Sequence, residues 1–205
     1  MYSMPKGLTA ATGMDALTHA IESYITPGAW VMSDMFELKA IEMIAQNLKA
    51  AVDNGKDVAA REAMSQAQYI AGMGFSNVGL GIVHSMAHPL GAFYDTPHGV
   101  ANALLLPYVM EYNAESPAAS KYIHIAKAMG VDTTGMSEAE GIKAAIEAVK
   151  ALSISINIPQ KLHEINVREE DIPALAVAAF NDVCTGGNPR PTSVEDIEVL
   201  YRKAF

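Results

Sequence analysis

Cysteine is nearly missing from this chain of 205 residues, which contains only Cys184. No disulfide can therefore form within the chain, and the class of small secreted proteins that depend on disulfides is excluded. Long apolar runs are missing too. The most apolar window, residues 100–110, is far too short to span a bilayer, and no N-terminal stretch joins a basic start to a continuous apolar run. We therefore expect a soluble, cytoplasmic protein without a membrane partner.

Positive charge is also scarce. The 14 lysines and arginines stand against 23 aspartates and glutamates, which gives a formal net charge of -9 at pH 7. A chain with this balance of charge repels a phosphate backbone on average. The composition thus predicts that nucleic acid is not a partner.

Strict alternation of apolar and polar residues, the pattern of a half-buried strand, is missing as well. Apolar residues recur instead at spacings of three and four, which is typical of helices. We therefore predict an all-α fold, in which residues 1–205 form a single helical domain with almost no sheet. The expected helices cover residues 12–25, 34–54, 58–75, 80 onward, 100–113, 118–129, 137–155, 169–180 and 194–204.

Three local signals refine the expected helices. Ser33 should cap the second helix through its hydroxyl, and Ser193 should begin the last helix in a capping box with Asp196. Pro89 should disturb the fourth helix, because proline has no amide hydrogen to donate.

A nucleotide-binding signature is not found in the sequence. The nearest approach is Gly79-Leu80-Gly81, which lacks both a preceding strand and the third glycine of a phosphate-binding loop. We interpret this segment as a place of close helix packing or a bend.

Asp15 and His19 are four residues apart and lie on the same face of the first expected helix. In this arrangement, the carboxylate and the imidazole can reach one cation. An ordinary surface ion pair has the same spacing, so this pair alone does not identify a metal site.

His84, His88 and His98 fall within fifteen residues, among apolar and glycine residues. Burying three protonated imidazoles together is costly, and a shared cation removes this cost. The alternative is a set of core histidines that are each hydrogen-bonded independently. Nitrogen and carboxylate ligands without thiolate favour Fe(II), Co(II), Ni(II) or Zn(II) over Ca(II), and they leave the choice among these four ions open.

Five motifs then occur in a fixed order along the chain. They are GMDALTHAIE at residues 13–22, GMGFSN at 72–77, HSMAHPLGA at 84–92, TPHG at 96–99 and DVCTGGNPR at 182–190. Together they resemble the iron-dependent group III alcohol dehydrogenases, and most closely the branch of lactaldehyde reductases, or 1,2-propanediol oxidoreductases. The resemblance extends over essentially the whole chain.

The resemblance implies roles for particular residues. Asp15, His19, His84 and His98 match the positions that bind the metal in this family. His88 matches a residue that lies beside the metal without binding it and is a candidate for relaying a proton. The resemblance also places Phe75 and Cys184 in the substrate pocket, although ordinary apolar packing explains these two residues equally well.

The resemblance also implies an activity and its cofactors. The chain is expected to be the metal-binding, helical domain of an oxidoreductase that interconverts small alcohols and aldehydes with NAD(P). The expected metal is Fe(II), which Zn(II) or Ni(II) can replace in a recombinant sample. Members of the family bind the nucleotide mainly through an N-terminal α/β domain, which this sequence does not contain. We therefore expect this chain alone to be inactive and to self-associate through the surface that the missing domain leaves uncovered. The resemblance also implies that the parent enzyme is a homo-oligomer.

Three alternative functions are weighed against this one. The first is a zinc-dependent relative such as a glycerol dehydrogenase or a dehydroquinate synthase, against which His98 in its TPHG motif favours the iron branch. The second is a helical metal-dependent phosphohydrolase, whose adjacent His-Asp pair does not occur in this sequence. The third is a non-enzymatic helical module in which the histidines are structural.

Overall fold

The described residues, 2–205 of a computed structural model, are folded into nine α-helices and four short 3-10 helices, without a strand. The all-α prediction is therefore confirmed. The α-helices are α1 (Lys6–Ile25), α2 (Val31–Asp53), α3 (Val58–Val78), α4 (Ile82–Tyr94), α5 (His98–Asn113), α6 (Tyr122–Ala128), α7 (Glu138–Ser155), α8 (Ile172–Phe180) and α9 (Val194–Ala204).

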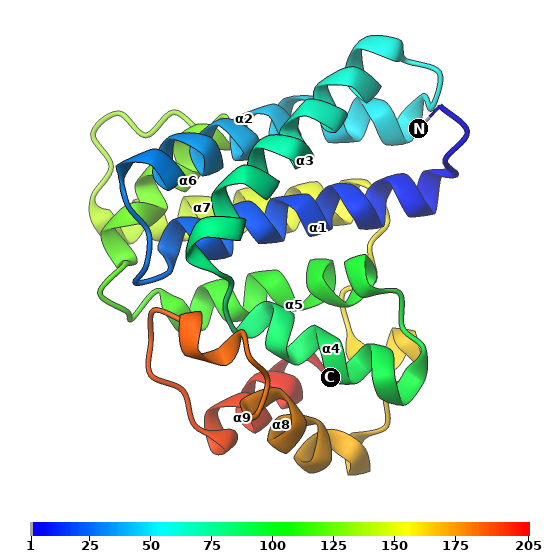
Figure 1. Ribbon diagram of the computed structural model, residues 1–205, viewed down its shortest axis with the longest axis vertical. Helices are drawn as coiled ribbons and strands as arrows, with labels where there is room; N and C mark the ends of the chain where they lie inside the picture. The colour runs from blue at the N-terminus through cyan, green and yellow to red at the C-terminus, as the bar shows by residue number, and fades with distance from the viewer. Residues whose placement is uncertain (1) are drawn as a thin grey trace.

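Helix α1 lies at the centre of the arrangement (Figure 1). On one side it packs against α2 and α3, and on the other side it packs against α5. Helix α4 lies beside α5 and is supported by α8, which in turn packs against α9. Helices α6 and α7 pair with each other and also contact α2.

The core is continuous through these helices. Met14, Leu17 and Ile21 recur along the buried side of α1, at the spacing of three and four that the sequence shows. Helices α1 and α5 approach each other closely at Gly99, where an added Cβ would lie 2.5 Å from the carbonyl oxygen of Ala11. This close approach brings the first turn of α5 against α1.

Helix α1 begins at Lys6, six residues before the predicted start at Thr12. The reason lies in tertiary packing. Ala10 and Ala11 are buried in the first turns of α1, and Pro5 has extended backbone angles that suit the residue before a helix. The predicted end at Ile25, before Thr26 and Pro27, is confirmed.

Ser33 does not cap α2, so this prediction is wrong. The helix begins two residues earlier, at Val31, and Ser33 occupies its third position. From there the hydroxyl accepts a hydrogen bond from the backbone N–H of Trp30 and donates one to the carbonyl of Trp30, both at 2.9 Å. Ser33 therefore bonds backward to the preceding residue rather than forward into the first turn.

The predicted disturbance at Pro89 does not end α4, which continues through this residue to Tyr94. Pro107 is likewise accommodated inside α5. The fourth helix begins at Ile82 rather than Leu80, and α3 extends three residues beyond the predicted end at Phe75. The segments predicted as helices over 118–129 and 169–180 begin with 3-10 turns, at Ala119–Lys121 and Glu169–Asp171, before α6 and α8.

The capping box predicted for the last helix is present. The Ser193 hydroxyl accepts from the backbone N–H of Asp196, and the Asp196 carboxylate accepts from the backbone N–H of Ser193. Across residues 2–205, none of the helices combines the length and the apolar character that crossing a membrane requires.

Candidate metal centre

Helix α1 presents Asp15 and His19 on one face, as their spacing predicts. The ring of His19 is held by its own helix, because Nδ1 lies 2.8 Å from the backbone carbonyl oxygen of Asp15. Nδ1 donates its hydrogen to that carbonyl, so the lone pair of the neutral ring is on Nε2. The Oδ2 atom of Asp15 lies 3.9 Å from Nδ1 of His19.

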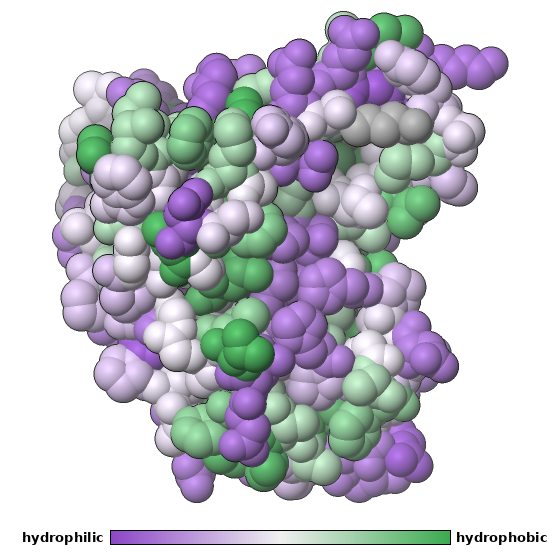
Figure 2. Space-filling model, in the orientation of Figure 1, coloured by the Kyte–Doolittle hydropathy of each residue, from purple (hydrophilic) through white to green (hydrophobic). Residues whose placement is uncertain are grey.

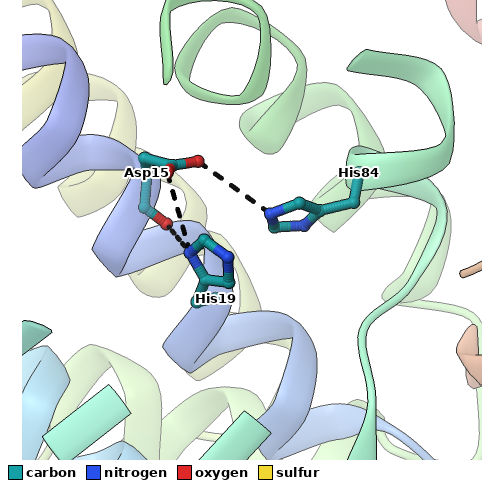
Figure 3. Close-up of side chains that lie close together, drawn as sticks. All are labelled: Asp15, His19 and His84. Atoms are coloured by element: carbon teal, nitrogen blue, oxygen red, sulfur yellow. Dashed lines mark hydrogen bonds and ion pairs between the residues drawn. The ribbon is translucent and has the colours of Figure 1, made fainter. Parts of the chain in front are cut away.

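His84 approaches this pair from α4 (Figure 3). Its ring centre is 4.4 Å from that of His19, and its Nε2 lies 3.9 Å from Oδ1 of Asp15. Donor atoms of Asp15, His19 and His84, one from each residue, all lie within 4.8 Å of one another. The structure thus brings together residues that are 69 positions apart in the chain (15 to 84).

His98 stands next to this group, at the first position of α5. Its Nε2 is 3.6 Å from Oδ1 of Asp15, and its ring centre is 5.4 Å from that of His84. Asn102, one turn further along α5, donates from Nδ2 to the same Asp15 oxygen at 2.7 Å, and this Nδ2 lies 2.9 Å from Nε2 of His98. Asn102 therefore ties the first turn of α5 to Asp15.

The orientation of His84 depends on a buried carboxylate. Nδ1 of His84 lies 2.5 Å from Oε2 of Glu22, and Oε1 of Glu22 accepts from the backbone N–H of Val83 at 2.7 Å. His84 is 2% exposed, and its Nε2 has no hydrogen-bond partner. A buried imidazole nitrogen without a partner is uncommon, and a cation at this position would satisfy it.

Charge and burial shift the pKa values of the three imidazoles in different directions. Burial lowers the pKa of His19, and the neighbouring His84 lowers it further. Burial also lowers the pKa of His98, with added repulsion from His84 and His88. For His84, burial disfavours the charged ring, but the carboxylate of Glu22, together with those of Asp15 and Asp182, outweighs this effect and raises the pKa. Neutral rings at His19 and His98 suit metal binding, which requires deprotonated nitrogen.

His88 lies one turn after His84 and belongs to a second group. Its side chain is 42% exposed, and its ring stacks on that of His98 with centres 5.4 Å apart. Nδ1 of His88 donates to Oδ2 of Asp182 at 2.8 Å, and Oδ1 of Asp182 accepts from the backbone N–H of Cys184 at 2.9 Å. Asp182 therefore connects His88 with Cys184, because it is hydrogen-bonded to both residues.

A cavity of about 500 Å³ opens next to the group, between α1 and α3. Asp15, His19 and Phe75 line it, and the rings of His19 and Phe75 have centres 4.4 Å apart. Cys184 does not line this cavity. Separately from this cavity, the outline of the molecule in Figure 2 is indented at its right-hand edge, between the N-terminal end of α1 and the helices α4 and α5 of Figure 1.

The donor set is chemically suited to a divalent transition ion. Three imidazoles and one carboxylate converge, and Nδ1 of both His19 and His84 is already held by an oxygen, which leaves Nε2 of each ring for a cation. Metal-binding histidines characteristically carry such a partner on the second nitrogen. Sequence reasoning missed Glu22, Asn102 and Asp182, although Glu22 lies on the Asp15 face of α1, seven residues on.

The chain is similar in sequence to known proteins. Residues 9–205 match the family described as Fe-containing alcohol dehydrogenase family, C-terminal. Lactaldehyde reductase of Escherichia coli (strain K12) is 60% identical over 205 residues, which are 100% of this chain and 53% of that protein. NAD-dependent methanol dehydrogenase of Bacillus methanolicus is 44% identical, over 100% of this chain and 54% of that protein.

Solved structures share the fold. A crystal structure of 1,3-propanediol oxidoreductase superposes with a TM-score of 0.98 at 46% identity, and the match covers 100% of this chain and 53% of that one. The chain thus spans about half the length of the relatives that it matches.

Proposed function

Because the chain belongs to the Fe-containing alcohol dehydrogenase family and corresponds to its C-terminal part, we propose that residues 1–205 form the metal-binding domain of an NAD(P)-dependent oxidoreductase. Its substrates are small alcohols and aldehydes. The observation that carries the proposal is the unpartnered, buried Nε2 of His84, which faces Asp15 within a group of three imidazoles.

Asp15, His19, His84 and His98 are the proposed ligands, and Fe(II) is the proposed ion. These residues fit a borderline divalent ion because they offer nitrogen and carboxylate oxygen without thiolate. The stacked position of His88, and its hydrogen bond to Asp182, keep it outside the ligand set.

When bound by these residues, the ion would supply Lewis acidity toward an alcohol or carbonyl oxygen, and the nicotinamide nucleotide would supply the hydride chemistry. The chain's own residues orient the substrate and move the proton. Phe75 packs against the ring of His19 and lines the same cavity as Asp15, so it offers an apolar surface to a substrate beside the site.

His88 is the proposed carrier of the alcohol proton. Asp182 accepts the Nδ1 hydrogen, so the neutral ring presents the lone pair of Nε2. The exposed ring provides a route from the site to solvent. Asp182 thereby sets the ring's tautomer, in the way that a carboxylate orients a general base.

The nucleotide requires a partner domain. Among the described residues there is no strand, and therefore no strand, glycine-rich loop and helix in the order that binds a dinucleotide. We propose that an N-terminal α/β domain supplies this function in the longer protein. Lactaldehyde and 1,2-propanediol are the proposed substrate pair, because the relative that is 60% identical is named lactaldehyde reductase.

The proposal is tested by the effect of metal on thermal unfolding. An ion that binds only the folded chain raises the midpoint with concentration, and its stabilisation reaches about 2.7 kcal/mol at 100 times the dissociation constant. We expect this response for the wild-type chain with Fe(II), Co(II) or Zn(II). His84→Ala should abolish the response and His88→Ala should largely preserve it, whereas a wild-type midpoint that ignores all three ions would refute the metal site.

The identity of the ion needs a separate measurement. Anomalous scattering at the iron and zinc edges, on crystals of the purified protein, distinguishes Fe(II) from Zn(II) and locates the ion among its ligands. A peak between His88 and Cys184, instead of one beside His84, would contradict the proposed ligand set.

A further inference from the structure

Glu22 is a charged side chain that the fold buries almost completely. It lies on α1, three residues after His19, and is 3% exposed. Both of its carboxylate oxygens accept hydrogen bonds from residues at the start of α4. Oε1 accepts from the backbone N–H of Val83, and Oε2 accepts from Nδ1 of His84. Burying a carboxylate is costly, so such complete satisfaction calls for a reason.

We propose that Glu22 is a positioning residue, which holds His84 in the one tautomer and orientation that leave Nε2 free to bind a cation. This inference rests on the proposed function, because it assumes that Nε2 of His84 is a ligand. A neutral histidine carries its hydrogen on either Nδ1 or Nε2. The carboxylate accepts hydrogen bonds and donates none, so it keeps the hydrogen on Nδ1 and the lone pair on Nε2.

The backbone before α4 leaves space for this carboxylate. At Gly81, an added Cβ would lie 2.9 Å from Oε1 of Glu22 and 3.3 Å from Oδ1 of Asn188. Gly81 therefore provides the space that Glu22 occupies before α4 begins. The Gly79-Leu80-Gly81 segment, which does not form a nucleotide-binding loop, thus makes room for the side chain of Glu22.

The C-terminal motif packs against the same segment, next to Gly81. An added Cβ at Gly187 would lie 1.9 Å from the carbonyl oxygen of Leu80, so the turn at residues 185–187 packs directly on the backbone before Gly81. Asn188 is held there by a pair of hydrogen bonds with Asn113, at 2.8 and 2.9 Å. Two glycine-containing motifs that are about a hundred residues apart thus converge on Glu22.

Glu22→Gln is the sharpest test, because it preserves size and inverts one hydrogen bond. The amide oxygen of the glutamine must accept from Val83, as Oε1 does now. Its NH2 group then points at Nδ1 of His84 and can only donate. The ring hydrogen is forced to Nε2, where it blocks the cation.

The measurement is calorimetric titration of the metal-free chain with Co(II). We expect Glu22→Gln to weaken Co(II) binding by 10- to 100-fold, on the order found for partners of metal ligands. Gly81→Ala, which displaces Glu22 without touching a ligand, should weaken it in the same direction. Glu37→Gln is the matched control, since Glu37 is a fully buried glutamate whose hydrogen bond is to the Ser23 hydroxyl and not to a histidine, and it should leave the affinity unchanged.

The tautomer is read directly by ¹⁵N NMR of the histidine-labelled chain, at a pH at which His84 is neutral. We expect hydrogen on Nδ1 in the wild type and on Nε2 in Glu22→Gln. A wild-type His84 with hydrogen on Nε2 overturns the inference without recourse to any variant, as does equal Co(II) affinity in wild type and Glu22→Gln. If the wild type binds no Co(II) at all, the proposed function fails instead, and the two failures are distinguishable.

Discussion

Glu37 is a fully buried carboxyl group in α2, in a position where ionisation is unfavourable. The Ser23 hydroxyl donates to Oε1 at 2.6 Å, while Oε2 has no hydrogen-bond partner. Burial raises the pKa of Glu37 to about 8, and the charge of Asp34 adds to the effect while the Ser23 hydrogen bond opposes it. Gly74 leaves the space for this side chain, since an added Cβ would lie within 1.9 Å of Oε1.

This pKa predicts a pH dependence of stability with a definite sign. The carboxyl titrates near 4.5 when the chain is unfolded and near 8 when it is folded, so the unfolded chain releases a proton that the folded chain retains. The free energy of unfolding should therefore fall as pH rises from about 4.5 to 8 and level off above 8. Glu37→Gln should remove this fall and stabilise the chain at pH 8 by a few kcal/mol, since one pKa unit corresponds to about 1.4 kcal/mol.

The comparison is made by urea unfolding of the metal-free wild type and of Glu37→Gln at several pH values. The difference between the two proteins isolates Glu37, because the histidines titrate in both. A difference that stays constant between pH 5 and pH 8 would contradict the raised pKa.

Cys184 should be an unreactive thiol. Burial raises its pKa to about 12, and the carboxylate of Asp182 contributes to the shift. Because the thiolate is the nucleophile, alkylation by iodoacetamide at pH 8 should be about 100-fold slower than for a free thiol, or slower still. Asp182→Asn should accelerate the reaction. Modification at the rate of free cysteine would show that the thiol is not held in this environment.

At the scale of elements, the site depends on how closely α1 and α5 approach each other. Gly99 follows His98 in the first turn of α5 and faces the backbone of Ala11, with no room for a Cβ. The first turn of α5 carries His98 and, one turn on, Asn102, both within reach of Asp15. Separating the two helices would therefore loosen the candidate metal centre as well as the core.

Gly99→Ala should destabilise the chain by roughly 1–3 kcal/mol, as expected for overpacking against a backbone that cannot move aside. It should also weaken Co(II) binding, because His98 is displaced from Asp15. Gly72→Ala is the control: Gly72 lies inside α3 with nothing within 4 Å of an added Cβ, so alanine should be neutral or stabilise the helix by up to about 1 kcal/mol. Thermal unfolding and calorimetry measure both effects, and equal behaviour of the two variants would disprove the close contact.

At the scale of the whole molecule, the candidate site lies at an edge where α1, α3, α4 and the C-terminal turn meet. All proposed ligands come from residues 15–98. From the end of the chain, Asp182 holds His88 and the turn at residues 185–187 packs on the backbone of Leu80. Under the proposed function, the nucleotide that exchanges the hydride is bound by another domain, because residues 2–205 contain no strand on which a dinucleotide fold could be built.

The 205-residue chain alone should not reduce lactaldehyde with NADH, even when it is loaded with metal, because residues 2–205 contain no strand on which a dinucleotide fold could be built. The measurement is NADH consumption at 340 nm, with the full-length lactaldehyde reductase of Escherichia coli as the positive control. Sustained turnover by the isolated chain would overturn the proposed division of labour. Self-association of the chain stays a prediction, which light scattering at increasing concentration can test.

Local patterns in the sequence were sufficient for much of this protein. Spacings of three and four predicted the all-helical fold, and the Ser193 capping box predicted the start of α9 correctly, because both depend on residues within a few positions of each other. The spacing of Asp15 and His19 put both on one helix face for the same reason. The ordered motifs indicated the family, which the comparison confirmed.

Contacts between distant segments could not be predicted in this way. Glu22 meets His84 across 62 positions, and His88 meets Asp182 across 94, so no local period connects them. The early start of α1 has the same cause, because the packing of Ala10 and Ala11 extends the helix. Ser33 is a different case, since its hydroxyl bonds locally, to Trp30 three residues back, and the sequence pattern does not distinguish this bond from a forward cap. The sequence thus predicted the candidate ligands, and the helix itself holds Nδ1 of His19. Tertiary packing decided which nitrogen His84 and His88 present, because the carboxylates of Glu22 and Asp182 that hold their Nδ1 atoms come within reach only in the folded chain.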